Sequence, residues 1–98
     1  MQFQLDYSEE AWKEFFHLKG SHGDSHHYKS VSKVLGLMQE DLHHPSLHTH
    51  KFHGFTTSSE AEVFETYAEN HTPGAYRVFW SYGPEKGSIR ILSIKPHS

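Results

Sequence analysis

The sequence predicts a single α+β domain in which two helices cover one face of an antiparallel β-sheet. The chain has 98 residues, enough for one compact domain over 1–98 and too few for two. Its first half carries apolar residues at helical spacing, whereas its second half contains short segments rich in aromatic and β-branched residues. A strand, a two-helix hairpin and an antiparallel meander in this order are expected to place both helices on one sheet face.

The first half of the chain has the pattern of a strand followed by two helices. Residues 3–7 alternate apolar and polar side chains, as a half-buried strand does. Ser8 is a candidate N-cap for a first helix that ends at Gly20. A second helix is expected over 25–40, and Pro45 prevents its extension much further along the chain.

Apolar stripes along both predicted helices indicate where the core lies. The stripes consist of Ala11, Trp12, Phe15, Phe16 and Leu18 in the first helix, and of Tyr28, Val31, Leu35, Met38 and Leu42 in or just after the second. Large aromatic side chains bury much area, so Trp12, Phe15, Phe16, Phe64 and Trp80 are expected in the core.

The second half of the chain predicts a β-meander. The expected strands are 48–52, 62–69, 76–82 and 88–95. A five-residue loop over 83–87 would pair Tyr82 with Ser88 across the last hairpin. This register puts Arg77, Phe79, Ser81, Ile89, Ile91 and Ser93 on the face away from the helices, and Tyr76, Val78, Trp80 and Leu92 against them.

The sheet face away from the helices, called the open face below, is the expected functional surface. Strand alternation separates apolar from polar residues in the segment 62–69 and assigns the polar ones to this face. The chemically active residues expected there are Glu65, Tyr67, Glu69, Arg77, Lys95 and His97.

The composition limits the classes of function. The chain has no cysteine, which excludes disulfides, thiolate catalysis and cysteine zinc sites. It has no signal-peptide pattern and no apolar run of the roughly 20 residues that a membrane span requires, so we expect a soluble cytoplasmic protein. The formal charge of −3 is unusual for a nucleic-acid ligand, but eleven histidines can add positive charge near neutral pH.

Several of the histidines are grouped in the segment that follows the second predicted helix. His48 and His50 have the spacing that places two imidazoles on one strand face, and His53 and His43-His44 are near them. Such a group can bind zinc, copper or nickel. A histidine-rich surface facing an anionic substrate is the interpretation that we favour, so no metal and no cofactor are expected.

Three segments carry a resemblance to a known family. They are His44-Pro45-Ser46-Leu47-His48-Thr49-His50-Lys51-Phe52-His53-Gly54, Tyr76-Arg77-Val78-Phe79-Trp80 and Ile94-Lys95-Pro96-His97. In order and spacing the chain resembles the RelE/ParE superfamily of toxins from type II toxin–antitoxin systems, and its RelE and YoeB branches in particular. Two positions depart from the YoeB pattern, because Ser46 replaces a glutamate base and Ser98 a terminal tyrosine.

The resemblance implies a ribosome-dependent endoribonuclease that cuts messenger RNA, inhibits translation and is neutralised by a cognate antitoxin. The reaction is attack of a ribose 2′-hydroxyl on the adjacent phosphate, without a metal. Arg77 is similar to the family's phosphate-binding arginine and His97 to its terminal histidine, an acid or base. Glu65 is the candidate base from its place on the open face. The substrate-binding candidates are Lys51, Lys95, Tyr67, His50 and Glu69.

Two other functions remain open on the sequence. The first is a ParE-like toxin that binds DNA gyrase and has no catalytic site. The second is a degenerate family member that only binds an antitoxin. The presence of Arg77 together with His97 favours cleavage over gyrase binding.

Overall fold

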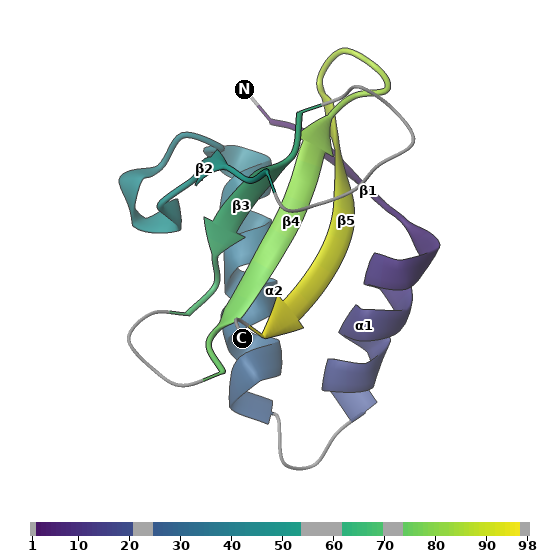
Figure 1. Cartoon of the computed structure of the whole chain (residues 1–98), viewed down its shortest axis with the longest axis vertical. Coiled ribbons are helices and arrows are strands. Elements are labelled where there is room, and N and C mark those ends of the chain that lie inside the picture. The colour runs from purple at the N-terminus through teal and green to yellow at the C-terminus, as the bar shows by residue number, and fades with distance from the viewer. Residues whose placement is uncertain (1, 21–24, 54–61, 70–73, 97–98) are drawn as a thin grey trace.

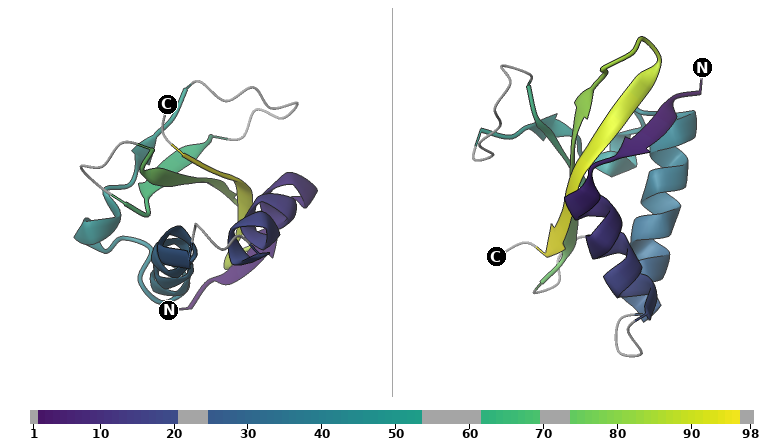
Figure 2. Two further views of the ribbon diagram at one scale, coloured as in Figure 1. Left: turned by 90° about the horizontal axis from the view of Figure 1, so that it is seen from below. Right: turned by 90° about the vertical axis from the view of Figure 1, so that its right-hand side faces the viewer.

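The computed structural model describes residues 2–20, 25–53, 62–69 and 74–96, and within them two helices pack on one face of a five-stranded sheet (Figures 1 and 2). The elements in chain order are β1 (Gln4–Tyr7), α1 (Glu9–Gly20), α2 (Ser25–Glu40), the 3₁₀ helix η2 (Pro45–Leu47), β2 (His50–Lys51), β3 (Phe64–Tyr67), β4 (Tyr76–Tyr82) and β5 (Ser88–Pro96). The strand order is β1-β5-β4-β3-β2. The predicted α+β class and the helices on one sheet face are confirmed.

Local sequence signals explain the start of α1 and the short helix that follows α2. The Ser8 hydroxyl accepts a hydrogen bond from the backbone N–H of Ala11 at 3.0 Å, which confirms Ser8 as the N-cap of α1. The same hydroxyl donates to the carbonyl of Leu92 at 2.8 Å and so ties α1 to β5. After α2, Pro45 begins the short helix η2, as its lack of an N–H allows.

The core lies between α2 and the helix-facing side of the sheet. Of the stripe predicted on and just after α2, all but Tyr28 are buried, and Tyr28 is partly buried against them; on the sheet, Trp80 is 1% exposed. The Trp80 indole N–H donates to the Thr66 hydroxyl at 2.8 Å, so the largest core side chain has its polar atom satisfied. Neither helix in the described part of the chain is long and apolar enough to cross a membrane.

The predicted burial of two aromatic residues on α1 is wrong. Trp12 is 49% exposed and Phe16 is 51% exposed. Their rings contact each other edge to face at 4.8 Å, and Tyr7 contacts Trp12 at 5.8 Å. The helix buries only a narrow stripe that includes Ala11 and Leu18, and it packs against β5, next to the edge strand β1.

The predicted register of the β4–β5 hairpin is also wrong. Tyr82 pairs with Ile89 instead of Ser88, and this shift of one residue turns Ile89 and Ile91 into the core, where both are fully buried. A β-bulge follows, because Trp80 pairs with Ile91 whereas Phe79 pairs with Ser93. The residue left over is Leu92, which is outside the core cluster, contrary to the prediction.

The bulge returns the residues beyond it to the sheet faces on which they were predicted. Beyond it Arg77 pairs with Lys95, two residues from the predicted partner, and a shift of two keeps each side chain on its predicted face. The N-terminal strand, for which the sequence pattern indicated no partner, lies parallel to β5 with Tyr7 beside Ile91.

Candidate active site on the open sheet face

Arg77 is held at the centre of the open face, opposite the core residues Val78 and Trp80 on β4. Its guanidinium carbon lies 3.7 Å from the centroid of the Tyr67 ring, and Tyr67 is its partner on β3. One terminal nitrogen, Nη1, donates to the backbone carbonyl of Glu69 at 2.7 Å. The side chain is only 9% exposed, so ring and carbonyl fix the cation in one orientation.

A carboxylate and an imidazole lie beside this arginine. Glu65 pairs in register with His50, and their side chains meet with 2.7 Å between Oε1 and Nε2. The second carboxylate oxygen of Glu65 lies 3.8 Å from Nε of Arg77. Glu65 is 7% exposed, and Arg77 and His50 are its partners, since a buried carboxylate without partners is costly.

The hydrogen bonds of His50 define where its protons lie. Its Nδ1 is 2.9 Å from the carbonyl oxygen of His48, and a carbonyl can only accept, so Nδ1 carries a proton. Its Nε2 lies 2.7 Å from Oε1 of Glu65, within hydrogen-bond distance. His50 is 46% exposed, which makes it the member of the pair that a substrate can reach.

Nε of Arg77 is a buried donor that has no hydrogen-bond partner among the described residues. Its 3.8 Å separation from Glu65 is an ion-pair distance but too long for a hydrogen bond. Buried donors without partners are rare, and they occur where a water or a ligand supplies the acceptor. The arginine therefore has hydrogen-bonding capacity left for an anionic group.

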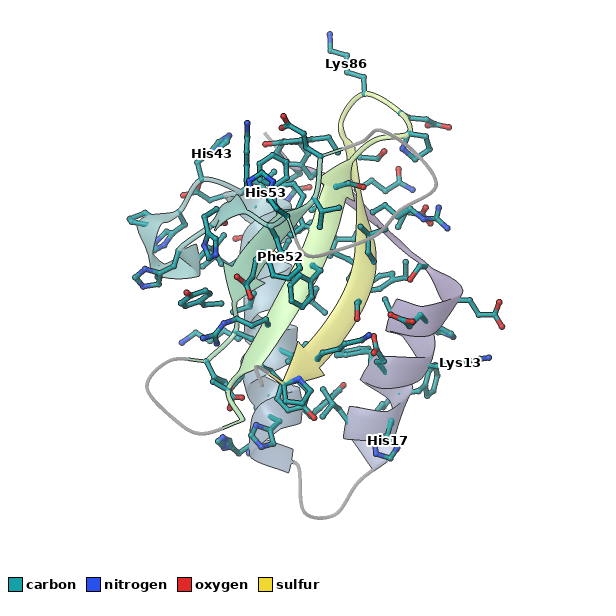
Figure 3. The ribbon with its side chains drawn as sticks, viewed as in Figure 1. Lys13, His17, His43, Phe52, His53 and Lys86 are labelled. Carbon is teal, nitrogen blue, oxygen red and sulfur yellow. The ribbon has the colours of Figure 1, made fainter. Side chains whose placement is uncertain are left out.

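The open face is more covered than its name suggests. Figure 3 shows Phe52 over the sheet, and its ring packs on Phe79 with 4.8 Å between centroids. Arg77 and Glu65 are both buried residues, although the alternation of β3 and β4 places them away from the helices as predicted. The active groups therefore lie in the sheet surface beside a hydrophobic patch.

The structure does not bring the two predicted lysines to Arg77. Lys95 is its register neighbour, yet the Lys95 ammonium pairs with Glu10 of α1 at 3.4 Å. It lines a hollow between α1 and β5 with Lys13 and His17, both labelled in Figure 3. Lys51 forms an ion pair with Glu62 at 3.2 Å. It pairs in register with Phe64 on β3, and the Phe64 ring stacks on Trp80 on the helix side of the sheet. Lys51 therefore lies on the helix side.

The expected place of Glu69 on the open face is wrong. β3 ends at Tyr67, and the chain bends before Glu69, so strand alternation no longer applies. The Glu69 carboxylate instead contacts His26 and His27 in the first turn of α2, at 2.7 and 2.8 Å. His97 lies outside the described residues, so its role stays a prediction.

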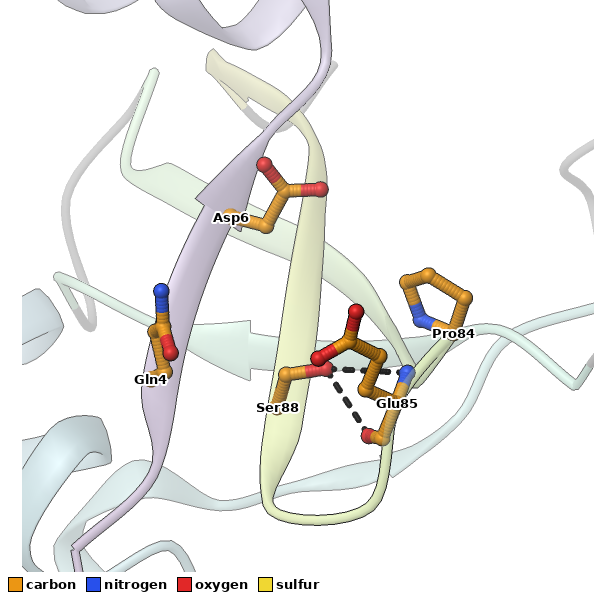
Figure 4. A pocket seen from close by; sticks show the side chains of 5 residues that line it. All are labelled: Gln4, Asp6, Pro84, Glu85 and Ser88. Atoms are coloured by element: carbon orange, nitrogen blue, oxygen red, sulfur yellow. Dashed lines mark hydrogen bonds between the residues drawn. The ribbon is translucent and has the colours of Figure 1, made fainter.

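A second hollow lies at the other end of the β4–β5 hairpin (Figure 4). It is lined by Gln4, Asp6, Pro84, Glu85 and Ser88. The Ser88 hydroxyl donates to the carbonyl of Glu85 at 2.8 Å, so it is engaged within the loop. Two acidic side chains and no basic ones make this hollow unsuitable for phosphate.

Sequence reasoning missed two features of the molecule. The first is the contact between His50 and Glu65, because the sequence predicts only substrate binding for His50. The contact follows once β2 and β3 are paired in register. The contact of His26 and His27 with Glu69 joins residues more than forty positions apart. The only sequence signal for this contact is the presence of two adjacent histidines at the start of a helix.

Comparison with known proteins places the fold among those of small bacterial and archaeal toxins. No family model and no curated protein matches the chain. Several solved structures resemble it, among them three toxins or toxin complexes. The YoeB/ParE toxin from Agrobacterium tumefaciens has a TM-score of 0.71 at 6% identity, over 98% of this chain and 100% of that one. The YoeB dimer from Staphylococcus aureus has 0.65 at 14%, over 100% of both chains. The E. coli RelBE toxin–antitoxin complex has 0.60 at 16%, over 98% of both. The chain therefore has the RelE/YoeB-like toxin fold.

Proposed function

We propose that this protein is an endoribonuclease toxin that cuts messenger RNA on the ribosome and thereby inhibits translation. One observation carries the proposal: Arg77 is held over Tyr67, beside a paired Glu65 and His50, on the sheet face of a RelE/YoeB-like fold. A fixed cation next to a proton-transfer pair is what cleavage at a phosphate requires. A cognate antitoxin is the proposed partner, supported by the likeness to the RelBE toxin–antitoxin complex, and the cytoplasm is the proposed location.

The proposed reaction needs three groups. The ribose 2′-oxygen forms a bond to phosphorus while the bond from phosphorus to the 5′-oxygen breaks, leaving a cyclic phosphate and a 5′-hydroxyl. Arg77 binds the phosphate oxygens, where negative charge increases, with donors that include its unpartnered Nε. A base takes the 2′-hydroxyl proton, and an acid gives a proton to the departing 5′-oxygen.

Glu65 and His50 are proposed to act as one proton-transfer unit. The sequence favours Glu65 as the base. However, Glu65 is buried and contacts His50, so His50 is the residue of the pair that contacts the substrate. The imidazole gives a proton to the departing 5′-oxygen, and Glu65 positions the ring. His97 is then the proposed base, on its resemblance alone. Lys51 and Lys95 are proposed to bind the RNA backbone.

The test is cleavage of a reporter message in a translating extract, mapped by primer extension. The wild-type chain should give new 5′ ends, and Arg77→Ala should remove them. Arg90→Ala is the matched control, because Arg90 pairs with Asp6 at 2.7 Å on the far edge of the sheet. Arg77→Lys, which keeps the charge and loses the planar fork, should retain the fold and lose most cleavage.

Three outcomes would contradict the proposal. Cleavage that survives in Arg77→Ala would exclude the arginine site. Intact message combined with inhibited DNA supercoiling would instead indicate a gyrase-binding toxin. Intact message and normal gyrase activity, with antitoxin still bound, would indicate a member that has lost activity. Circular dichroism of each variant separates lost chemistry from lost folding.

A further inference from the structure

A group of metal-ligand side chains lies where the first turn of α2 meets the chain after β3, two elements that Figure 1 shows. His26 Nε2 is 2.7 Å from one oxygen of Glu69, and His27 Nδ1 is 2.8 Å from the other. Within the described ranges this is the one group of three such residues whose ligand atoms all lie within 4.8 Å of one another.

The Glu69 carboxylate is fixed in place before any ligand arrives. Its side chain is 7% exposed, and Oε1 also accepts a hydrogen bond from the backbone N–H of Tyr76 at 3.0 Å. A carboxylate that is buried and oriented by a backbone donor resembles the supported ligands of metal sites. His26, in contrast, is 67% exposed, so an ion can enter from solvent on that side.

The donor set selects a class of ion. Two imidazoles and one carboxylate form a common three-ligand set for Zn²⁺, with bonds of about 2.0–2.2 Å and a fourth position for water. Mg²⁺ and Ca²⁺ prefer all-oxygen sites and would bind weakly here. The imidazole nitrogens lie 2.7–2.9 Å from the carboxylate oxygens, and all the ligand atoms lie within 4.8 Å of one another, so small side-chain movements would let them surround one ion.

We propose that His26, His27 and Glu69 bind one divalent transition-metal ion of the zinc class. The site is separate from the group proposed for cleavage, but Glu69 belongs to both neighbourhoods. Its carboxylate contacts the histidines, while its backbone carbonyl accepts from Nη1 of Arg77 at 2.7 Å. A bound ion would therefore hold α2, the end of β3 and the carbonyl that orients Arg77 in one arrangement.

The experiment is a zinc titration of the full chain, freed of metal, by isothermal titration calorimetry, with Mg²⁺ as the comparison ion. One tight Zn²⁺ per chain is expected. His26→Gln should weaken its affinity at least about tenfold, because even the loss of a supporting partner costs about 10- to 100-fold. His26 is exposed, so this variant should fold normally. His43→Gln is the matched control, since it removes another exposed histidine and should leave the tight site unchanged.

A second measurement tests whether the ion binds the folded site. Zn²⁺ should raise the melting temperature of the wild-type chain and of His43→Gln, and should raise that of His26→Gln much less. Tetrahedral Co²⁺ absorption that disappears in His26→Gln would give the ligand geometry. The proposal is overturned if no tight Zn²⁺ binds, if His26→Gln and His27→Gln bind as well as wild type, or if His43→Gln alone abolishes binding. None of these results depends on RNA cleavage.

Discussion

The guanidinium carbon of Arg77 lies 3.7 Å from the centroid of the Tyr67 ring, and the two residues face each other on β4 and β3. A cation over an aromatic face is stabilised by about 0.5–2 kcal/mol, more when water is excluded. The arginine is 9% exposed, so the ring contributes to its orientation as well as to its binding energy.

Replacing the ring should therefore weaken catalysis through Arg77. Tyr67→Leu should lower the rate of message cleavage about twofold to thirtyfold, the range that about 0.5–2 kcal/mol represents. Tyr67→Phe keeps the aromatic face and should cleave within about twofold of wild type. Primer-extension time courses measure both. An equal loss in the two variants would show that the hydroxyl matters and the ring face does not.

The terminal histidine is testable without knowledge of its geometry. If His97 is the base, His97→Gln should lower cleavage on the order of 100-fold or more, the usual contribution of general base catalysis. The control is Lys86→Gln, which removes an exposed positive charge at the tip of the β4–β5 hairpin and should cleave at the wild-type rate. An unchanged rate in His97→Gln would remove this residue from the mechanism and leave the base to be found elsewhere.

The pattern of apolar residues predicted much of the fold, and its failures have physical causes. On α2 every residue of the predicted stripe contacts the core, because a helix packed against the sheet buries a broad face. On α1 the same type of stripe misled, since Trp12 and Phe16 lie beyond the area that the sheet can cover. Periodicity gives the apolar side of a helix but not how much of it another layer reaches.

The sequence contains a signal for the bulge in the β4–β5 hairpin. Ile89, Ile91 and Ile94 are all buried, so the spacing of two and then three residues is itself the sequence signal of a bulge. Alternation placed Glu65, Tyr67 and Arg77 on one face correctly, because each lies inside a regular strand. Alternation had no bearing on Glu69, which lies past the end of β3.

The stability of the chain should reflect the corrected core. Met38 is fully buried, so Met38→Ala should lower the free energy of unfolding by about 2–5 kcal/mol. Phe16 is 51% exposed and mainly contacts Trp12, so Phe16→Ala should cost about 0.5–1.5 kcal/mol, the value of an aromatic pair. Urea unfolding followed by circular dichroism measures both. A larger loss for Phe16→Ala than for Met38→Ala would contradict the assignment of the core.

Glu65 and His50 should behave as a single unit in the reaction. Glu65→Gln removes the carboxylate that contacts the imidazole, and His50→Gln removes the imidazole that is proposed to give the proton. Each variant should lower cleavage on the order of 100-fold or more.

The combination of the two changes separates a unit from two independent groups. The double variant should cleave within about threefold of the slower single variant, because groups that act together are strongly non-additive. Losses that multiply would mean that each residue contributes separately. A wild-type rate in His50→Gln with a large loss in Glu65→Gln would return the base role to Glu65 alone, as strand alternation first indicated. Glu65 also lies 3.8 Å from Arg77, so its replacement can disturb the position of the arginine. Unfolding curves for each variant must therefore accompany the rates, to separate this structural effect from the loss of proton transfer.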